Sequence, residues 1–146
     1  METNTKYFGT IPYTEEEVIT FENGIFGFEE HKRYLLIRFE EDNAGLLCLQ
    51  NLEDAQLAFI VANPFVFLPD YAPQVAEADL KKLGNPAPES LAFYTTCVLA
   101  EDMSQSTTNL RCPLVINGET KQAVQVILED TAYGFKQPFH ELIKEK

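Results

Sequence analysis

Residues 59–71 of the chain read Phe-Ile-Val-Ala-Asn-Pro-Phe-Val-Phe-Leu-Pro-Asp-Tyr. The apolar run from Leu57 to Ala62 has the length of a buried strand. Asn63-Pro64 ends this strand because proline has no amide donor and restricts the residue before it. Aromatic residues and a second proline crowd into the positions that follow, without a group typical of catalysis. The stretch therefore predicts a strand that runs into a stiff aromatic turn suited to contact with another protein.

The aromatic side chains of this turn can either fill the core or face a partner, because aromatic residues dominate both environments. Both alternatives stay open for Phe65 and Phe67, although the apolar residues on each side of Phe67 favour the core for that ring. Tyr71 follows Asp70 in a polar, turning segment, so we expect its side chain to be exposed. Phe65, Asp70 and Tyr71 are our candidate partner-binding residues in this segment.

Strand-like segments recur along most of the chain and indicate a largely β protein. Asn117-Gly118 has the chemistry of a turn with positive φ, which predicts a hairpin between the last two of these segments. Asn43-Ala44-Gly45 is expected to form the turn between the second and third segments. The segments cover residues 17–21, 34–39, 46–50, 57–62, 91–99, 113–117 and 121–128.

Only two segments carry helical signals. Residues 74–83 repeat apolar side chains at helical spacing and are followed by Gly84, a typical helix stop. A second short helix is predicted over residues 140–144. A chain of 146 residues has the length of one domain. We therefore expect an all-β fold, a small antiparallel β-barrel-like single domain over residues 1–146 with one or two short helices.

Acidic residues outnumber basic ones, with 23 Asp and Glu against 11 Lys and Arg and a formal charge of −12. Residues 1–58 hold twelve of the acids and only four of the bases. No basic patch is present to neutralise phosphates, so direct binding to nucleic acid is not expected. An acidic surface favours a basic protein partner instead, although the charge can also serve solubility alone. The run Glu40-Glu41-Asp42 is our candidate for contact with such a partner.

Side chains that carry catalysis or hold metals are sparse and scattered. Cys48, Cys97 and Cys112 lie in apolar contexts without C-x-x-C spacing, which indicates reduced, buried cysteines. His31 and His140 are far in sequence from these cysteines, which disfavours a zinc site. We find no nucleophile motif and no glycine-rich nucleotide loop, and a carboxylate pair formed in space is the catalytic option left open. We therefore expect no catalytic, cofactor-binding or metal site and a protein that is not an enzyme.

The sequence carries no signal for a membrane or for export. No apolar run reaches the roughly 18 residues of a membrane helix, and residues 1–5 lack the basic start of a signal peptide. We therefore expect a cytoplasmic protein that does not contact a membrane and that is a monomer when free.

Four blocks of the sequence resemble, in the same order, the flagellar assembly factor FliW family. Phe21 to Glu29 (Phe-Glu-Asn-Gly-Ile-Phe-Gly-Phe-Glu) resembles the family's early turn, and residues 59–71 resemble its strand followed by a proline turn and Pro-Asp-Tyr. Asn109 to Asn117 (Asn-Leu-Arg-Cys-Pro-Leu-Val-Ile-Asn) resembles the block Asn-Leu-x-Ala-Pro-Ile-Val-Ile-Asn. Residues 122–133 resemble the family's Gln-rich strand, acidic step and tyrosine.

The chain departs from the family pattern at three positions, where size or charge changes little. Asn63, Cys112 and Lys136 stand where the family has Asp, Ala and often Arg.

Asn109 is expected to be structural, because an Asn side chain between a polar loop and a strand commonly bonds to nearby backbone.

The resemblance implies a cytoplasmic assembly factor that alternates between newly made flagellin and the RNA-binding translational repressor CsrA. In that family, binding to CsrA prevents repression of flagellin translation, and accumulating flagellin sequesters the factor. The acidic residues would then meet CsrA, and the aromatic turn would meet an amphipathic helical end of flagellin. Two other classes stay open: a small-molecule-binding or catalytic β-barrel with an internal pocket, and a structural component of the flagellum, which would need a secretion route.

Overall fold

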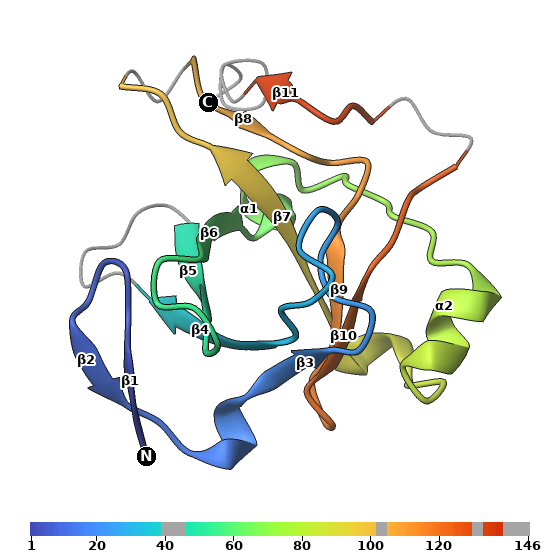
Figure 1. Cartoon of the computed structure of the whole chain (residues 1–146). Coiled ribbons are helices and arrows are strands. Elements are labelled where there is room, and N and C mark those ends of the chain that lie inside the picture. The colour runs from blue at the N-terminus through green and yellow to red at the C-terminus, as the bar shows by residue number, and fades with distance from the viewer. Residues whose placement is uncertain (39–45, 102–104, 130–132, 139–146) are drawn as a thin grey trace.

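The computed structural model of the protein describes residues 1–38, 46–101, 105–129 and 133–138 (Figure 1). Its helical elements are short: η1 Glu15–Glu17, α1 Pro64–Phe67, α2 Glu77–Lys82 and η2 Pro88–Ser90. Its strands are β1 Glu2–Asn4, β2 Thr10–Pro12, β3 Ile19–Phe21, β4 Arg33–Arg38, β5 Leu46–Asn51, β6 Ala58–Ala62, β7 Leu91–Val98, β8 Thr107–Thr108, β9 Leu114–Asn117, β10 Gln122–Gln125 and β11 Gln137–Pro138.

Seven of these strands form a closed barrel, visible in Figure 1 as a ring that runs from β3 through β7 to β9 and β10. Neighbours are antiparallel from β3 to β7, and the pairs β7–β9 and β9–β10 are antiparallel as well. The ring closes with a parallel pair, in which Gln122 and Ala123 of β10 lie opposite Thr20 and Phe21 of β3. The predicted all-β, barrel-like fold is confirmed, with this parallel pair as the exception to its antiparallel pairing.

The predicted strand segments correspond to the seven barrel strands, and the structure adds elements that the pattern did not indicate. The N-terminal hairpin β1–β2 and the strands β8 and β11, which extend the sheet beyond β7, are only two or three residues long. Such lengths are too short for alternation to be visible in the sequence. The predicted turn at residues 43–45 and the predicted helix at residues 140–144 lie outside the described residues.

The predicted hairpin between β9 and β10 is present, but the residue with positive φ is not the predicted glycine. Lys121, rather than Gly118, has the positive φ of 64°. The N–H of Gly118 instead donates to the carbonyl oxygen of Ser90 at 2.8 Å. A Cβ atom at position 118 would lie 3.1 Å from that oxygen, so glycine permits the close approach of these two segments.

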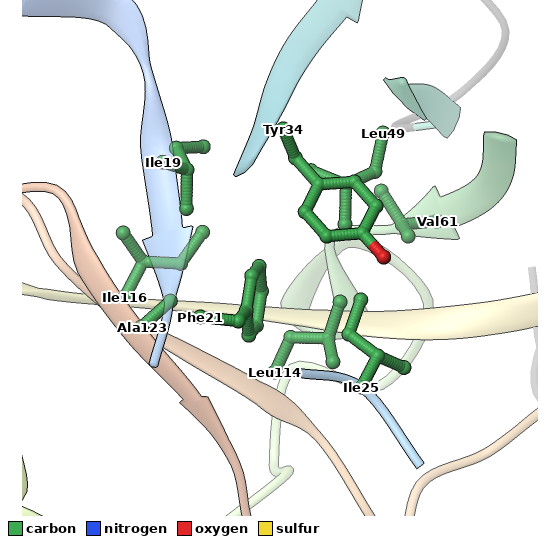
Figure 2. Close-up of a cluster of buried hydrophobic side chains, with 9 residues drawn as sticks. All are labelled: Ile19, Phe21, Ile25, Tyr34, Leu49, Val61, Leu114, Ile116 and Ala123. Carbon is green, nitrogen blue, oxygen red and sulfur yellow. The ribbon is translucent and has the colours of Figure 1, made fainter. Parts of the chain in front are cut away.

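Apolar side chains from every barrel strand fill the interior. Figure 2 shows the buried ones among them. At its centre the rings of Phe21 and Tyr34 pack edge to face, with their centroids 5.5 Å apart. Alternate residues of each strand point inward, as the two-residue period of a strand requires. The buried members of this interior cluster are Ile19, Phe21, Ile25, Tyr34, Leu49, Val61, Leu114, Ile116 and Ala123.

A second apolar cluster covers the outer face of β7, β9 and β10. The chain from Leu68 to Leu83 crosses this face, and α2 and its C-cap Leu83 belong to that crossing segment. The helix is shorter than the predicted 74–83, because Ala76 is an N-cap with extended backbone. The buried members of this outer cluster are Tyr71, Leu83, Leu110, Val115, Val124, Val126 and Leu128.

All three cysteines are free, as predicted. Cys48 and Cys112 are buried and Cys97 is half-buried. Burial raises the pKa of the Cys48 and Cys97 thiols to about 11, which keeps both protonated and unreactive at neutral pH. Within the described ranges, no helix is long and apolar enough to cross a membrane.

Candidate protein-binding surface

The aromatic stretch that follows β6 begins with a one-turn helix, α1. The Oδ1 atom of Asn63 accepts a hydrogen bond from the N–H of Phe65 at 3.1 Å, and Pro64 occupies the first helical position. Both features favour a helix start, because the cap satisfies a free amide and proline lacks one. Asn63 therefore caps α1 with its amide oxygen, at a position where the family that the sequence resembles has a carboxylate.

α1 divides its side chains between the core and the surface. Pro64 and Phe67 are buried, and Phe67 packs on Ala62. Phe65 and Val66 point the other way, with 39% and 42% of their surface exposed. The prediction that Phe67 belongs to the core is confirmed. Val66 was not among the candidates, although the spacing of three between Pro64 and Phe67 indicates that the residues between them face outward.

The exposed ring of Phe65 packs against two other aromatic rings. Its centroid lies 5.9 Å from that of Phe93 on β7 and 5.7 Å from that of Tyr71. A ring supported in this way keeps one orientation, so it loses little freedom when a partner covers it.

The prediction that Tyr71 is exposed is wrong, because only 4% of its surface is accessible. Its hydroxyl donates a hydrogen bond to the carbonyl oxygen of Leu110 at 2.6 Å, and its ring lies 4.8 Å from that of Tyr133. The N–H of Ala72 donates in turn to the Tyr133 hydroxyl at 2.9 Å. Burial raises the pKa of Tyr71 well above its ordinary value of 10.0. Tyr71 is thus a buried residue against which the ring of Phe65 packs. Its neighbour Asp70 is exposed.

Asn109 organises the segment that receives the Tyr71 hydroxyl. Its Oδ1 atom accepts hydrogen bonds from the N–H groups of Arg111 at 3.2 Å and Cys112 at 2.9 Å. These bonds turn the chain around Leu110 and fix the direction of its carbonyl group. The expected hydrogen bonds of Asn109 to nearby backbone are confirmed.

The candidate acids Glu40, Glu41 and Asp42 lie outside the described residues. The next described residue after them, Leu46, pairs with Ala62, which comes directly before the cap of α1.

Most acidic side chains of residues 1–38 form no ion pair with a described basic residue. Among the described residues, ion pairs join Arg33 to Glu15 at 3.1 Å and Lys82 to Asp79 at 4.0 Å. Glu53 is satisfied by backbone, since it accepts bonds from the N–H groups of Lys32 and Arg33, and the first of these bonds lowers its pKa the most. Residues 1–38 hold seven acidic and four basic side chains, so the surface that they form carries a net negative charge that suits a basic partner.

Among the described residues, the interior of the barrel offers no comparable site, because apolar side chains fill it and polar groups do not converge there. A surface cavity of about 150 Å³ lies beside α2 and is lined by Thr20, Glu22, Asn23, Lys82, Gln122, Ala123 and Val124. Ligand pockets commonly measure about 300–1,000 Å³, so this hollow does not support the small-molecule alternative.

Comparison with known proteins gives a consistent answer over nearly the whole chain. The sequence model of one family, described as FliW protein, matches residues 2–139. A flagellar assembly factor FliW from Caldanaerobacter subterraneus subsp. tengcongensis is 40% identical over 144 residues, which cover 99% of this chain and 96% of that protein. Its counterpart from Alkaliphilus metalliredigens is 36% identical over 141 residues, which cover 97% of this chain and 85% of that protein.

A solved structure is similar as well. The crystal structure of a flagellar assembly factor FliW superimposes with a TM-score of 0.89 at 31% sequence identity. The superposition covers 95% of this chain and 96% of the other.

Proposed function

Because the chain belongs to the FliW family of flagellar assembly factors, we propose that it works by binding two proteins in turn, flagellin and the translational repressor CsrA. While the protein holds CsrA, flagellin continues to be translated. As flagellin accumulates, it takes the protein away and CsrA resumes repression. Both partners are met in the cytoplasm, where translation takes place.

The observation that carries this proposal is the pair of exposed apolar side chains on α1. Phe65 and Val66 lie side by side on a helix whose opposite face is buried, and Phe93 and Tyr71 hold the Phe65 ring in place. Exposed, well-supported aromatic residues of this kind are typical of binding hot spots. An amphipathic helical end of flagellin is the ligand that suits such a surface, with Asp70 at its rim.

CsrA calls for a different contact. A protein that binds RNA presents basic groups, and these are attracted by the acid-rich residues 1–58. We assign Glu40, Glu41 and Asp42 to this contact. Tyr71 is assigned to support of Phe65 and not to direct contact, because it is buried.

The flagellin contact is tested by Phe65→Ala, with Tyr7→Ala as the matched control at an exposed aromatic residue of the N-terminal hairpin. Loss of a hot-spot ring is expected to weaken flagellin binding by about 2 kcal/mol, roughly thirtyfold in Kd, while Tm stays near that of the wild type. Calorimetric titration of both variants with flagellin and with CsrA gives the answer. A wild-type protein that binds neither partner would refute the proposal, and wild-type affinity of Phe65→Ala for flagellin would remove α1 from the interface.

The CsrA contact is tested by the triple change of Glu40, Glu41 and Asp42 to Lys. The association rate with CsrA is expected to fall and to depend less on salt, since steering by charge is lost. Glu77→Lys on α2 is the control for a change of surface charge elsewhere. An unchanged association rate at low salt would exclude residues 40–42 from the contact.

A further inference from the structure

The block Phe21–Glu29 contains a tight turn that presents two aromatic rings to solvent. The N–H of Phe28 donates to the carbonyl oxygen of Ile25 at 2.7 Å, and Gly27 has a φ of +87°. This is the pattern of a type II turn with glycine at its third position. Ile25 is buried in the barrel interior, whereas Phe26 and Phe28 are 47% and 39% exposed.

The turn is anchored to the barrel from several sides. The N–H of Phe26 donates to Oε1 of Gln125 at 2.8 Å, and the Gln125 side chain is itself bonded to the carbonyl oxygen of Cys112. The ring of Phe28 packs edge to face on Phe59 at 5.2 Å. These anchors fix the backbone of the turn and the ring of Phe28 before any partner arrives, which lowers the entropy lost on binding.

A third exposed apolar side chain belongs to the segment that anchors the turn. Ile127 follows β10 and is 56% exposed. Val126 and Leu128 on either side of it belong to the outer cluster, so Ile127 shares the face of Gln125, which holds the N–H of Phe26. Phe26, Phe28 and Ile127 together are called the Phe26 surface below.

Acidic residues flank the turn in the sequence. Glu22, Glu29 and Glu30 are exposed, and a carboxylate oxygen of Glu29 accepts a hydrogen bond from the N–H of Gly27 at 2.9 Å. This hydrogen bond holds the pKa of Glu29 below its ordinary value, so the turn carries a negative charge at its tip. Apolar rings flanked by carboxylates match a basic surface that carries an apolar side chain.

The Phe26 surface is separate from α1. Phe28 rests on Phe59 near the start of β6, whereas α1 follows the end of that strand. We propose that the Phe26 surface is a second docking surface, which binds the basic, RNA-binding partner of the protein. The assignment rests on the proposed function, in which CsrA is that partner. The Phe26 surface then supplies short-range apolar contact, and the acidic residues supply long-range attraction.

The test uses the full-length protein with Phe26→Ala and Ile127→Ala, each titrated with CsrA and with flagellin. Tyr7→Ala and Val98→Ala are matched controls, since each removes an exposed apolar side chain elsewhere on the surface. We expect each test variant to weaken CsrA binding about tenfold or more, to leave flagellin binding within about twofold and to keep the wild-type Tm.

A photo-crosslinking residue at position 26 supplies a second measurement on folded protein and is expected to capture CsrA. Wild-type affinity of both variants for CsrA, or capture of flagellin alone, would overturn the assignment while the proposed function stands. A wild-type protein that does not bind CsrA would overturn the CsrA contact of the proposed function and this assignment together.

Discussion

At the residue scale, Tyr34 and Tyr71 are both buried, but their hydroxyl groups have different surroundings. The hydroxyl of Tyr71 is bonded to the carbonyl oxygen of Leu110, whereas that of Tyr34 is buried without a hydrogen-bond partner among the described residues. Burial raises the pKa of Tyr34 to about 12, despite the opposing influence of the Asn51 side chain. The Asn51 amide is already bonded to the backbone of Arg33 and Glu53. Tyr71 therefore links two segments, and Tyr34 serves mainly as an apolar ring in the barrel interior.

Removing each hydroxyl separates these roles. Tyr71→Phe is expected to lower the free energy of unfolding by about 1–2 kcal/mol, because it leaves the buried Leu110 carbonyl unsatisfied. Tyr34→Phe is expected to leave that free energy unchanged or to raise it, since it removes a buried polar group without a partner. Urea unfolding of both variants measures the difference. A loss at position 34 as large as that at position 71 would contradict this account.

At the scale of a single element, the turn at residues 24–28 depends on two glycines for different reasons. Gly24 and Gly27 both have positive φ, at +70° and +87°. A Cβ atom at Gly24 would lie 2.5 Å from the Cα atom of Glu29, whereas one at Gly27 would meet nothing within 4 Å. Gly24 is therefore needed for both conformation and space, and Gly27 for conformation alone.

The two alanine variants of this turn test that distinction. Gly27→Ala is expected to cost about 1 kcal/mol of stability through its backbone conformation. Gly24→Ala adds a backbone clash and is expected to cost about 1–3 kcal/mol more. Denaturant unfolding of the two variants reports the difference in stability. Equal losses would show that the backbone of Glu29 moves away from the added Cβ atom at no cost in free energy.

At the scale of the whole molecule, stability rests on two apolar layers that meet at the sheet. One fills the barrel, and the other lies between the outer face of the sheet and the segment from Leu68 to Leu83. Both layers contain titratable groups that burial keeps neutral. Tyr34 and the half-buried Tyr94 belong to the interior, Tyr71 belongs to the outer layer, and the pKa of each is raised.

Alkaline pH is therefore expected to destabilise the fold. A raised folded pKa means that the stabilisation is complete below the ordinary tyrosine value of 10.0 and is lost as pH rises toward about 12 for Tyr34. At pH 11 the loss is about 1 kcal/mol for Tyr34, Tyr71 and Tyr94 act in the same direction, and buried Cys48 adds to the same trend from about pH 9. Unfolding free energies at pH 8, 10 and 11 measure the slope, which Tyr34→Phe is expected to reduce. A protein equally stable at pH 8 and pH 11 would contradict the burial of these groups.

Local patterns in the sequence were sufficient to predict much of this protein. Apolar runs and turn residues indicated the seven barrel strands, because the two-residue period and turn chemistry act between near neighbours. The core position of Phe67, the backbone bonds of Asn109 and the free cysteines followed from the same local reasoning. The aromatic character of the candidate surface on α1 was also visible, since Phe65 follows a proline stop.

Tertiary structure alone decided the features that join distant segments. Tyr71 looked exposed beside Asp70, but Leu110, 39 positions later in the chain, accepts its hydroxyl and the outer layer covers its ring. The glycine of Asn117-Gly118 proved necessary because Ser90 approaches it, and the parallel pairing of β10 with β3 joins strands about a hundred residues apart. The rigidity of the Phe26 turn likewise depends on Gln125. Sequence patterns report the preferences of neighbouring residues, whereas burial and closure depend on which distant segments meet, and this is settled only when the whole chain packs.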